Sequence, residues 1–333
     1  MESQPLLELR SVSKRFAKPL DTAARIGKLL GAHVKEEIVH AVDHVDLSIP
    51  RGEVVGLVGE SGCGKSTLGR MAAGLHTLSA GKRLWKGEEI DLLTPAARRK
   101  KQLGMQMIFQ DPYASLNPRM RVQDIVGEAP LVHGIVTKAE QRDYVEHLLR
   151  KVGLDTGVLK RFPHQFSGGQ RARVGIARAL AVKPEFLVCD ESVAALDISI
   201  QAQVINLFMQ LRQELNLTYL FISHDLSVVQ HIADRVLIMY LGRVIEMAPS
   251  QEIFETPNHP YSQALLAEAP RLEVKKKNFV AIQGEIPSPL NPPSGCHFHP
   301  RCPYAMPRCK AEVPQLKEIA PLRFSACHLN DQQ

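Results

Sequence analysis

The chain carries two kinds of hydrophobic pattern that are typical of β-strands. Residues 6–16 and 38–49 alternate apolar and polar side chains, as strands with one buried face do. Shorter apolar runs predict strands buried on both faces, at residues 54–58, 105–109, 186–189, 219–222 and 236–240. Helices are predicted at residues 67–75, from the capping box Thr137-x-x-Glu140 to Val152, at 170–180 and after Asp197 or Ser199. Strands that alternate with helices predict an α/β fold with a mainly parallel sheet.

The remaining segments are predicted to be turns, loops and one connector. Leu241-Gly242 follows an apolar run and predicts a hairpin whose second strand is residues 243–246. Residues 287–293 are rich in proline and predict an extended connector. The others are an inserted loop or short helix at 17–37, turns with short strands at 79–89, a loop at 111–120 and a partly helical stretch from 256 to about 280.

Composition and charge indicate an ordinary globular chain. Of 333 residues, 44% are hydrophobic and 23% charged, and no apolar run approaches the roughly 18 residues of a membrane-spanning helix. The first residues lack the basic start and apolar core of a secretion signal, so we expect a cytoplasmic location. Two short basic runs, at 98–101 and 275–277, are typical of solvated faces and support an anionic membrane or nucleic acid only weakly. One Trp and few aromatic residues argue against stacking on single-stranded nucleic acid.

A glycine-rich loop between the strand at 54–58 and the helix at 67–75 is the strongest chemical signal. It reads Gly59-Glu60-Ser61-Gly62-Cys63-Gly64-Lys65-Ser66-Thr67 and fits the phosphate-loop pattern G-x-x-x-x-G-K-[ST]. Its glycines let backbone N–H groups turn toward a phosphate. Lys65 supplies charge for the β and γ phosphates, and the Ser66 hydroxyl is a Mg²⁺ ligand. The loop therefore predicts a nucleoside triphosphate site.

Polar residues follow several later strands, where parallel sheets bind ligands. Gln110 follows residues 105–109, Asp190-Glu191 follows 186–189, and His224 comes shortly after 219–222. Beside a phosphate loop, the acidic pair indicates a Mg²⁺ ligand and a catalytic carboxylate rather than a solvated turn. Ser167-Gly168-Gly169 begins a helix, so it is a second place suited to a phosphate.

Four of the six cysteines lie close together, with the spacing C-x5-C-x6-C-x17-C: Cys296, Cys302, Cys309 and Cys327. A cytosolic chain disfavours structural disulfides, so these thiols predict a metal site. By chemistry alone Zn²⁺ on four thiolates is the default, although none of the spacings is the short one of zinc modules. An iron–sulfur cluster and bare thiols are the alternatives.

The motifs together resemble those of ABC-type ATPases. Phe166-Ser167-Gly168-Gly169-Gln170 resembles the family signature LSGGQ, with Phe in place of Leu. The other motifs follow in the family's order, with Gln110 as the Q-loop, residues 186–191 as Walker B, 194–197 as the D-loop and His224 as the switch histidine. Phe16 stands where the family has an aromatic side chain stacked on adenine. The resemblance implies a P-loop NTPase fold with a mainly parallel core sheet, an antiparallel β subdomain and a helical subdomain at about 110–180.

Three further stretches, residues 111–119, 259–266 and 287–293, look like the dipeptide/oligopeptide importer ATPases, and in particular their second ATPase subunit. The insertion after Phe16 and the cysteine-bearing tail do so too. The resemblance implies a nucleotide-binding domain over residues 1–255 and a Cys-rich C-terminal extension over 256–333. It favours a [4Fe–4S] cluster over zinc, with His297, His299 and His328 as non-ligands.

The resemblance also implies a role for each site residue, with ATP and Mg²⁺ as cofactors. Residues 59–67 hold the phosphates, and Ser66, Asp190 and Gln110 serve Mg²⁺. Glu191 polarises the attacking water and His224 senses the γ-phosphate. The segment Ser167-Gly168-Gly169-Gln170 serves ATP on a second ATPase subunit, so that two nucleotides lie head to tail between two subunits.

The implied partners are that second ATPase subunit, most simply in a heterodimer, two transmembrane permease subunits and an extracytoplasmic solute-binding protein, with no nucleic acid. The implied location is the cytoplasmic side of the cell (inner) membrane. Alternatives are an importer ATPase for nickel, glutathione or another small solute, a non-transport ABC ATPase acting in translation or DNA repair, and an iron–sulfur regulatory protein.

Two positions depart from the family pattern. Ser192 replaces the Pro that commonly follows the catalytic Glu, and Ala194 replaces the Ser that commonly precedes Ala-Leu-Asp. Neither change removes a catalytic group, so ATP turnover is still expected.

Overall fold

The computed structural model describes residues 4–17, 37–267 and 284–332. In this described part, a mixed sheet of eight strands forms the centre, in the order β11-β12-β10-β9-β3-β8-β7-β6. The five neighbouring strands β9, β3, β8, β7 and β6 are parallel to one another. At the other edge, β10, β12 and β11 each pair antiparallel. Their bounds are Val54–Val58 (β3), Met105–Ile108 (β6), Phe186–Asp190 (β7), Thr218–Ile222 (β8), Arg235–Tyr240 (β9), Arg243–Pro249 (β10), Lys317–Ala320 (β11) and Arg323–Ser325 (β12).

The parallel strands are buried on both faces because their alternate side chains enter two different cores. In β3, Val54 and Val58 pack in one hydrophobic cluster, whereas Val55 and Leu57 pack in the other. The first cluster is covered by the helices α7 (Gly168–Leu180), α8 (Ile198–Leu215), α9 (Leu226–Ile232), α10 (Ser250–Glu255) and α11 (Pro260–Ala267). Burial on both faces explains the continuous apolar runs of these strands.

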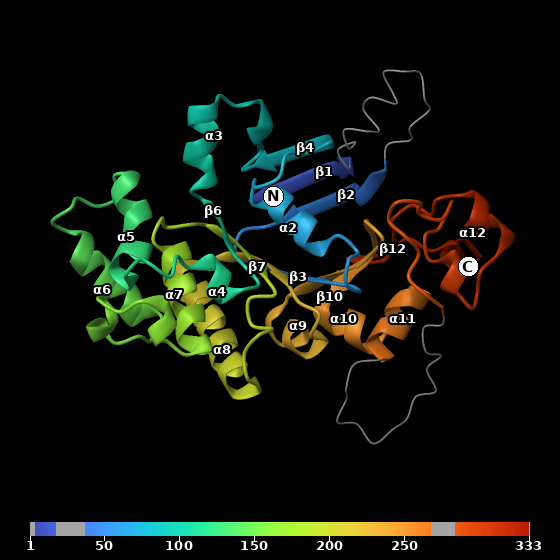
Figure 1. Cartoon of the computed structure of the whole chain (residues 1–333). Coiled ribbons are helices and arrows are strands. Elements are labelled where there is room, and N and C mark those ends of the chain that lie inside the picture. The colour runs from blue at the N-terminus through green and yellow to red at the C-terminus, as the bar shows by residue number, and fades with distance from the viewer. Residues whose placement is uncertain (1–3, 18–36, 268–283, 333) are drawn as a thin grey trace, which may run out of the picture.

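A second, antiparallel sheet covers the opposite face together with α2 (Figure 1). Its order is β2-β1-β4-β5. Its strands are Leu7–Ala17 (β1), Ile38–Ile49 (β2), Ala80–Trp85 (β4) and Glu88–Glu89 (β5), and α2 spans Lys65–Ala72. Leu7, Leu9 and Leu47 are buried against the core, which accounts for the alternating pattern of these strands.

A group of helices extends from the β6 edge of the main sheet (Figure 1). It contains α4 (Pro112–Ser115), α5 (Val122–Val132), α6 (Gln141–Lys151) and the start of α7, while α3 (Pro95–Gln102) precedes β6. Val145, Leu148, Leu149 and Val152 of the predicted amphipathic face are buried. The Thr137–Glu140 capping box forms, since Glu140 Oε2 accepts the Thr137 N–H at 2.8 Å.

Several predicted elements differ in detail from the structure. The helix after the phosphate loop begins at Lys65, not Thr67, and ends at Ala72, because Gly74 takes a left-handed conformation. The predicted loop at 111–120 contains the short helix α4, and α6 begins at Gln141, after the capping box. Most of the predicted insertion at 17–37, and residues 268–280, lie outside the described residues.

The C-terminal residues add two strands to the central sheet. β12 pairs with β10 through Glu246–Ser325 and Met247–Phe324, and β11 pairs with β12. Helix α12 (Pro307–Ala311) lies beside them, next to α11 (Figure 1). The predicted division between residues 255 and 256 stays a prediction.

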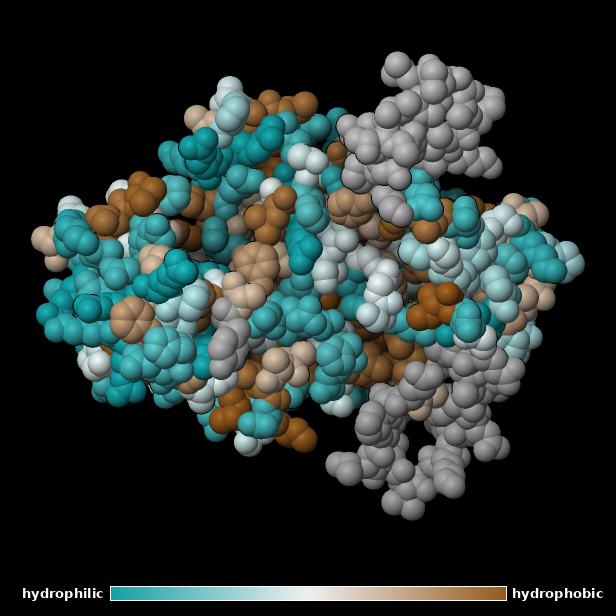
Figure 2. Space-filling model, in the orientation of Figure 1, coloured by the Kyte–Doolittle hydropathy of each residue, from teal (hydrophilic) through white to brown (hydrophobic). Residues whose placement is uncertain are grey.

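The visible surface mixes hydrophobic and hydrophilic residues over the described part of the chain (Figure 2). Within that part, none of the helices has the length and apolar character needed to cross a membrane.

Candidate functional site

The phosphate loop joins β3 to α2, as its sequence predicts. The Lys65 ammonium is buried and donates to the carbonyl oxygens of Gly59 at 2.8 Å and Glu60 at 2.9 Å, so it points into the loop. A Cβ on Gly64 would lie 2.1 Å from the Ala41 carbonyl oxygen, and Gly64 has a φ of 108°. Only glycine fits at this position, which fixes the loop against β2.

Ser66 and Asp190 meet beside the loop. The Ser66 hydroxyl donates to Asp190 Oδ1 at 2.8 Å, across 124 residues of sequence. Burial raises the pKa of the Asp190 carboxyl, and the hydrogen bond from Ser66 opposes that rise. A hydroxyl and a carboxylate in contact are hard oxygen ligands of the kind Mg²⁺ prefers, so the pair fits this ion.

Glu191 lies between two polar side chains that come from neighbouring strand ends. Its Oε2 accepts a hydrogen bond from Gln110 Nε2 at 2.6 Å and lies 3.4 Å from His224 Nδ1. The backbone of Glu191 is left-handed, with a φ of 46°. Non-glycine residues seldom take this conformation, and residues strained in this way recur at active sites. Gln110, Glu191 and His224 thus form one polar group at the carboxyl edge of the sheet.

The Ser167–Gln170 segment lies at the start of α7, in the helical group. The Ser167 hydroxyl caps the helix by accepting the Gln170 N–H at 3.4 Å, and the Gln170 side chain accepts the Ser167 N–H at 3.1 Å. Gly169 is closely packed, because a Cβ there would lie 2.4 Å from Ile200 Cγ2. Over the described residues no hydrogen bond connects this segment to the phosphate loop.

Phe16 is partly exposed on β1. Its ring meets the His76 ring edge-on at 5.6 Å between centroids, and Lys14 Nζ lies 5.2 Å from its centroid. The stacking of Phe16 on adenine stays a prediction.

The four late cysteines line one narrow cavity of about 10 Å³, together with Phe298. Burial raises the pKa of the Cys296 and Cys327 thiols to about 11. In the chain as described, no group of three or more His, Cys, Asp or Glu side chains is placed to hold a single metal ion. The four cysteines therefore surround one cavity, and among the described residues they do not form the geometry of a one-ion site.

Each of the three histidines near these cysteines has a ring nitrogen within hydrogen-bond distance of a backbone oxygen. His297 Nδ1 lies 3.0 Å from the Leu241 oxygen, and His299 Nδ1 lies 2.9 Å from the Cys296 oxygen. His328 Nε2 lies 3.1 Å from the Glu312 oxygen. Their assignment as non-ligands stays a prediction that these contacts favour.

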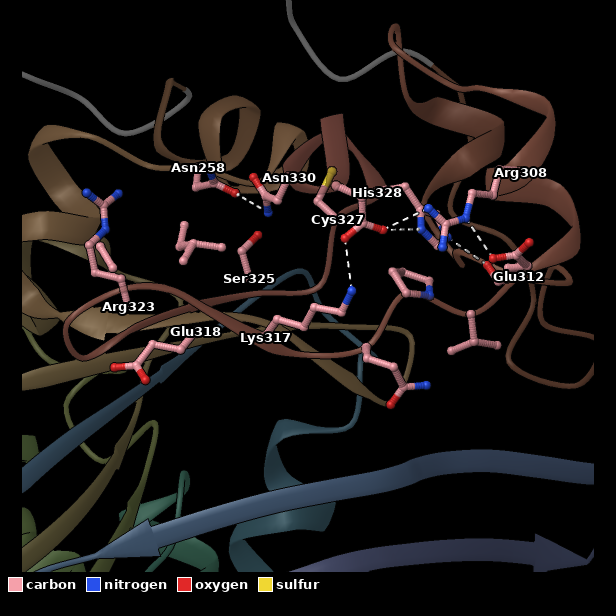
Figure 3. Close-up of a pocket in the computed structure, with 16 residues that line it drawn as sticks. Asn258, Arg308, Glu312, Lys317, Glu318, Arg323, Ser325, Cys327, His328 and Asn330 are labelled. Carbon is pink, nitrogen blue, oxygen red and sulfur yellow. Dashed lines mark hydrogen bonds and ion pairs between the residues drawn. The ribbon is translucent and has the colours of Figure 1, made fainter. Parts of the chain in front are cut away.

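Cys327 also lines a separate groove of about 600 Å³ (Figure 3). Its cations face carboxylates, since Arg308 pairs with Glu312 and Asp331, and Lys317 also pairs with Asp331. These ion pairs are largely exposed, so they contribute little to stability.

Sequence reasoning missed residues outside the motifs that contact the phosphate loop. Arg301 and the Tyr261 hydroxyl both contact Glu60. Tyr261 lies in residues 259–266, which the sequence marks only by their family resemblance, and nothing in the sequence around Arg301 indicates this contact.

The parallel sheet, the phosphate loop at its centre and the acidic pair at the neighbouring strand end define the class of the protein, a P-loop ATPase of the ABC type. The family model described as ABC transporter matches residues 42–194, and the model described as oligopeptide/dipeptide transporter, C-terminal region, matches residues 245–309.

The relatives and the solved structures agree with this class. The oligopeptide transport ATP-binding protein AppF of Bacillus subtilis is 50% identical over 331 residues, covering 98% of both chains. A putative peptide import ATP-binding protein of Brucella ovis is 45% identical over 328 residues, again covering 98% of both. The chain belongs to the ABC transporter ATPases, within their oligopeptide/dipeptide transporter family.

Two solved structures share the fold at lower identity. CbiO1 of Clostridium perfringens, part of the ABC transporter complex CbiONQ, aligns with a TM-score of 0.62 at 27% identity, over 76% of this chain and 92% of that one. The ATP-binding cassette MJ0796, in a dimeric post-hydrolysis state bound to ADP and Pi, aligns with a TM-score of 0.61 at 26% identity, over 73% of this chain and 98% of that one.

Proposed function

We propose that the chain is the ATP-hydrolysing, energy-coupling subunit of a membrane importer for dipeptides or oligopeptides. The observation that carries this proposal is the placement of Glu191 between Gln110 and His224, beside the Ser66–Asp190 pair. The names of the relatives and the match of residues 245–309 to the peptide-transporter region support peptides as the solute. An importer for nickel, glutathione or another small solute is the alternative.

In the proposed mechanism the phosphate loop binds ATP. Ser66 and Asp190 would hold Mg²⁺, which would supply positive charge to neutralise the phosphates. Glu191 orients and polarises the attacking water, as a carboxylate within hydrogen-bond reach does. Gln110 and His224 fix the Glu191 side chain from two sides. Gln110 also reports the state of the site to a membrane subunit, and His224 responds to the γ-phosphate.

Ser167 to Gln170 act on the ATP of a second ATPase subunit in this proposal. The helix start offers backbone N–H groups, and the side chains of Ser167 and Gln170 form their hydrogen bonds within the segment. The dimeric state of the similar cassette MJ0796 supports such an arrangement. We propose a heterodimer bound to two permease subunits on the cytoplasmic side of the cell (inner) membrane, supplied by an extracytoplasmic solute-binding protein.

Replacement of Glu191 tests the proposed catalysis. Glu191→Gln keeps the size and polarity of the side chain but removes the carboxylate, so ATP binding is expected to persist while hydrolysis falls by roughly 10²-fold or more. The measurement is ATP turnover of the assembled complex, with nucleotide binding measured in parallel.

Glu185→Gln is the matched control, because Glu185 is the same residue type near the start of β7 and pairs with Arg51 and Lys86. Wild-type turnover in Glu191→Gln would contradict the assigned role. Uptake of labelled peptides, nickel and glutathione by proteoliposomes holding the full complex distinguishes the candidate solutes.

We also propose that residues 256–333 form a Cys-rich extension whose four late cysteines hold a [4Fe–4S] cluster. The shared cavity of Cys296, Cys302, Cys309 and Cys327 supports this, because four thiolates are the usual ligands of such clusters. A cluster is larger than one ion and separates its ligands further, whereas a zinc site needs them around a single point. When bound, the cluster would link the segments that carry these cysteines.

The test is iron, acid-labile sulfide and zinc analysis of protein purified without oxygen. The expected result is iron and sulfide in equal amounts, absent from the variant with all four cysteines changed to serine. Protein that holds neither iron nor sulfide would refute the cluster, and stoichiometric zinc alone would replace it with the zinc alternative.

A further inference from the structure

Residues far beyond the phosphate-loop motif contact the loop at a single residue, Glu60. Arg301 donates from Nη1 to Glu60 Oε2 at 2.8 Å and from Nη2 to Glu60 Oε1 at 2.9 Å. Two parallel hydrogen bonds between a guanidinium and a carboxylate make a strong, geometrically defined pair. The side chains are 6% and 20% exposed, so water screens this pair less than it screens an ordinary surface pair.

Tyr261 makes a second contact, with the backbone of the same residue. The Glu60 N–H donates to the Tyr261 hydroxyl oxygen at 2.9 Å. Tyr261 belongs to α11 and is fully buried. Its ring packs on Tyr240 at 4.7 Å and on Phe298 at 5.4 Å between centroids, so its hydroxyl is held by a rigid aromatic group.

The third polar group of Glu60 contacts the lysine of the motif. The Glu60 carbonyl oxygen accepts a hydrogen bond from Lys65 Nζ at 2.9 Å. The N–H of Glu60 thus binds Tyr261, its carboxylate binds Arg301 and its carbonyl binds Lys65. Glu60 therefore connects the lysine of the motif to Tyr261 and Arg301. These two residues lie 201 and 241 positions after Glu60 in the sequence.

The negative charge of Glu60 explains why its contact with Arg301 affects nucleotide binding. The loop binds an anion through N–H groups and Lys65, and a carboxylate within the loop opposes that binding. Arg301 contacts both oxygens of Glu60 and neutralises it. Without Arg301, the negative charge of Glu60 would stand unpaired beside the phosphates and lower the affinity for ATP.

We propose that Arg301 and Tyr261 are positioning residues of the ATP site, acting through Glu60. Arg301 cancels the charge of Glu60, and Tyr261 fixes the backbone of the loop. The region after the nucleotide-binding motifs is thereby part of the ATP site, and ATP affinity depends on whether that region is docked on the loop.

The test is the dissociation constant for a fluorescent ATP analogue with Mg²⁺, measured on the full chain, with a thermal melting curve for each variant. Arg301→Gln is expected to weaken binding by about tenfold, as one unpaired charge near the nucleotide does. Adding Glu60→Gln to Arg301→Gln removes that charge, so the double variant is expected to bind within about threefold of the wild type. A purely structural role of Arg301 predicts no such rescue.

Two further variants sharpen the test. Tyr261→Phe leaves the charges unchanged but removes the partner of the Glu60 N–H, so binding weakens and Glu60→Gln does not restore it. Arg308→Gln is the matched control, because Arg308 also forms ion pairs in the C-terminal region, with Glu312 and Asp331 in the groove of Figure 3, and wild-type affinity is expected.

Wild-type affinity in Arg301→Gln would overturn the proposal, and so would a double variant that binds as weakly as the single one. If Arg301→Gln does not fold, the affinity of the double variant is the test, because that variant has no unpaired charge at position 60. A folded double variant more than about tenfold weaker than the wild type would then overturn the proposal.

Discussion

His259 shows how burial fixes the charge of one residue. It is 1% exposed, its Nδ1 accepts the Tyr261 N–H at 3.0 Å, and burial lowers its pKa to about 3. The folded chain thus keeps His259 neutral, whereas the unfolded chain protonates it below about pH 6.5. Between these two values the unfolded state binds an extra proton, so the stability falls as the pH falls.

We expect His259→Asn to lose this pH dependence, because the Asn oxygen also accepts the Tyr261 N–H without taking up a proton. The wild type should lose about 2 kcal/mol more than the variant between pH 7 and pH 5. Urea unfolding at several pH values measures the difference. Buried Glu246 faces His259 in both proteins, so its contribution cancels, and parallel pH profiles would contradict the assignment.

The glycines of the phosphate loop can be predicted from the sequence motif, but their packing cannot. The pattern G-x-x-x-x-G-K-[ST] predicts the loop and its curvature. Gly62 has open space around it, with a φ of 77°, whereas Gly64 meets the Ala41 carbonyl oxygen. The crowding of Gly64 depends on β2, a separate strand, so the sequence of the loop alone could not predict it.

At the scale of elements, the start of α7 combines a structural cap with the proposed contact to a partner's ATP. The Thr137–Glu140 capping box before α6 has the same chemistry without that second role. Ser167→Ala and Thr137→Ala should each cost about 1 kcal/mol of stability.

We expect only Ser167→Ala to slow ATP hydrolysis by the assembled complex, since only this cap serves a nucleotide in the proposed dimer. Chemical unfolding and ATP turnover are measured for both variants. Equal turnover in the two would show that the segment does no more than cap its helix.

The sequence predicted helices and strands correctly where the pattern of hydrophobic residues was clear. The buried strands were predicted from their apolar runs, and the helices α6 and α8 from an apolar face that repeats clearly. Helix α7 was predicted because its residues are rich in Ala and Arg, which favour helices. Helix α5 was missed, because Pro130 interrupts a short pattern that depends on packing against α6 and α7. Strands β11 and β12 were also missed, because β10, the strand on which β12 pairs, lies more than sixty residues away in sequence, and β11 joins the sheet only through β12.

Across the whole molecule, the candidate site was predicted only in part. The motifs gave Lys65, Ser66, Asp190 and Glu191, because each carries chemistry at a fixed spacing. The contacts of Arg301 and Tyr261 depend on how the last part of the chain docks, and no local pattern encodes that docking.

The docking of the C-terminal strands also predicts a stability effect. Removing residues 314–333 deletes β11 and β12 and exposes the edge of β10, which should lower the melting temperature and promote association of chains. Melting curves and size-exclusion chromatography measure both effects.

Leu322→Gly is expected to raise the melting temperature, in contrast to the truncation. Leu322 is 66% exposed and has a φ of 62° in the turn between β11 and β12, so glycine relieves strain of about 1 kcal/mol without loss of packing. A chain without residues 314–333 that melts at the same temperature as the full chain and associates no more than it does would show that these strands are not needed by the sheet.

The pairing of β12 with β10 has a consequence for synthesis of the protein. β10 ends at Pro249 and β12 ends at Ser325, so the ribosome adds 76 more residues before the partner of that edge exists. At 5–20 residues per second this takes about 4 to 15 s. During that time each nascent chain carries an ATPase core with an unpaired strand edge, and neighbouring ribosomes on one message hold such edges close together. The order of the strands therefore leaves this edge of the sheet without its partner strand until late in translation.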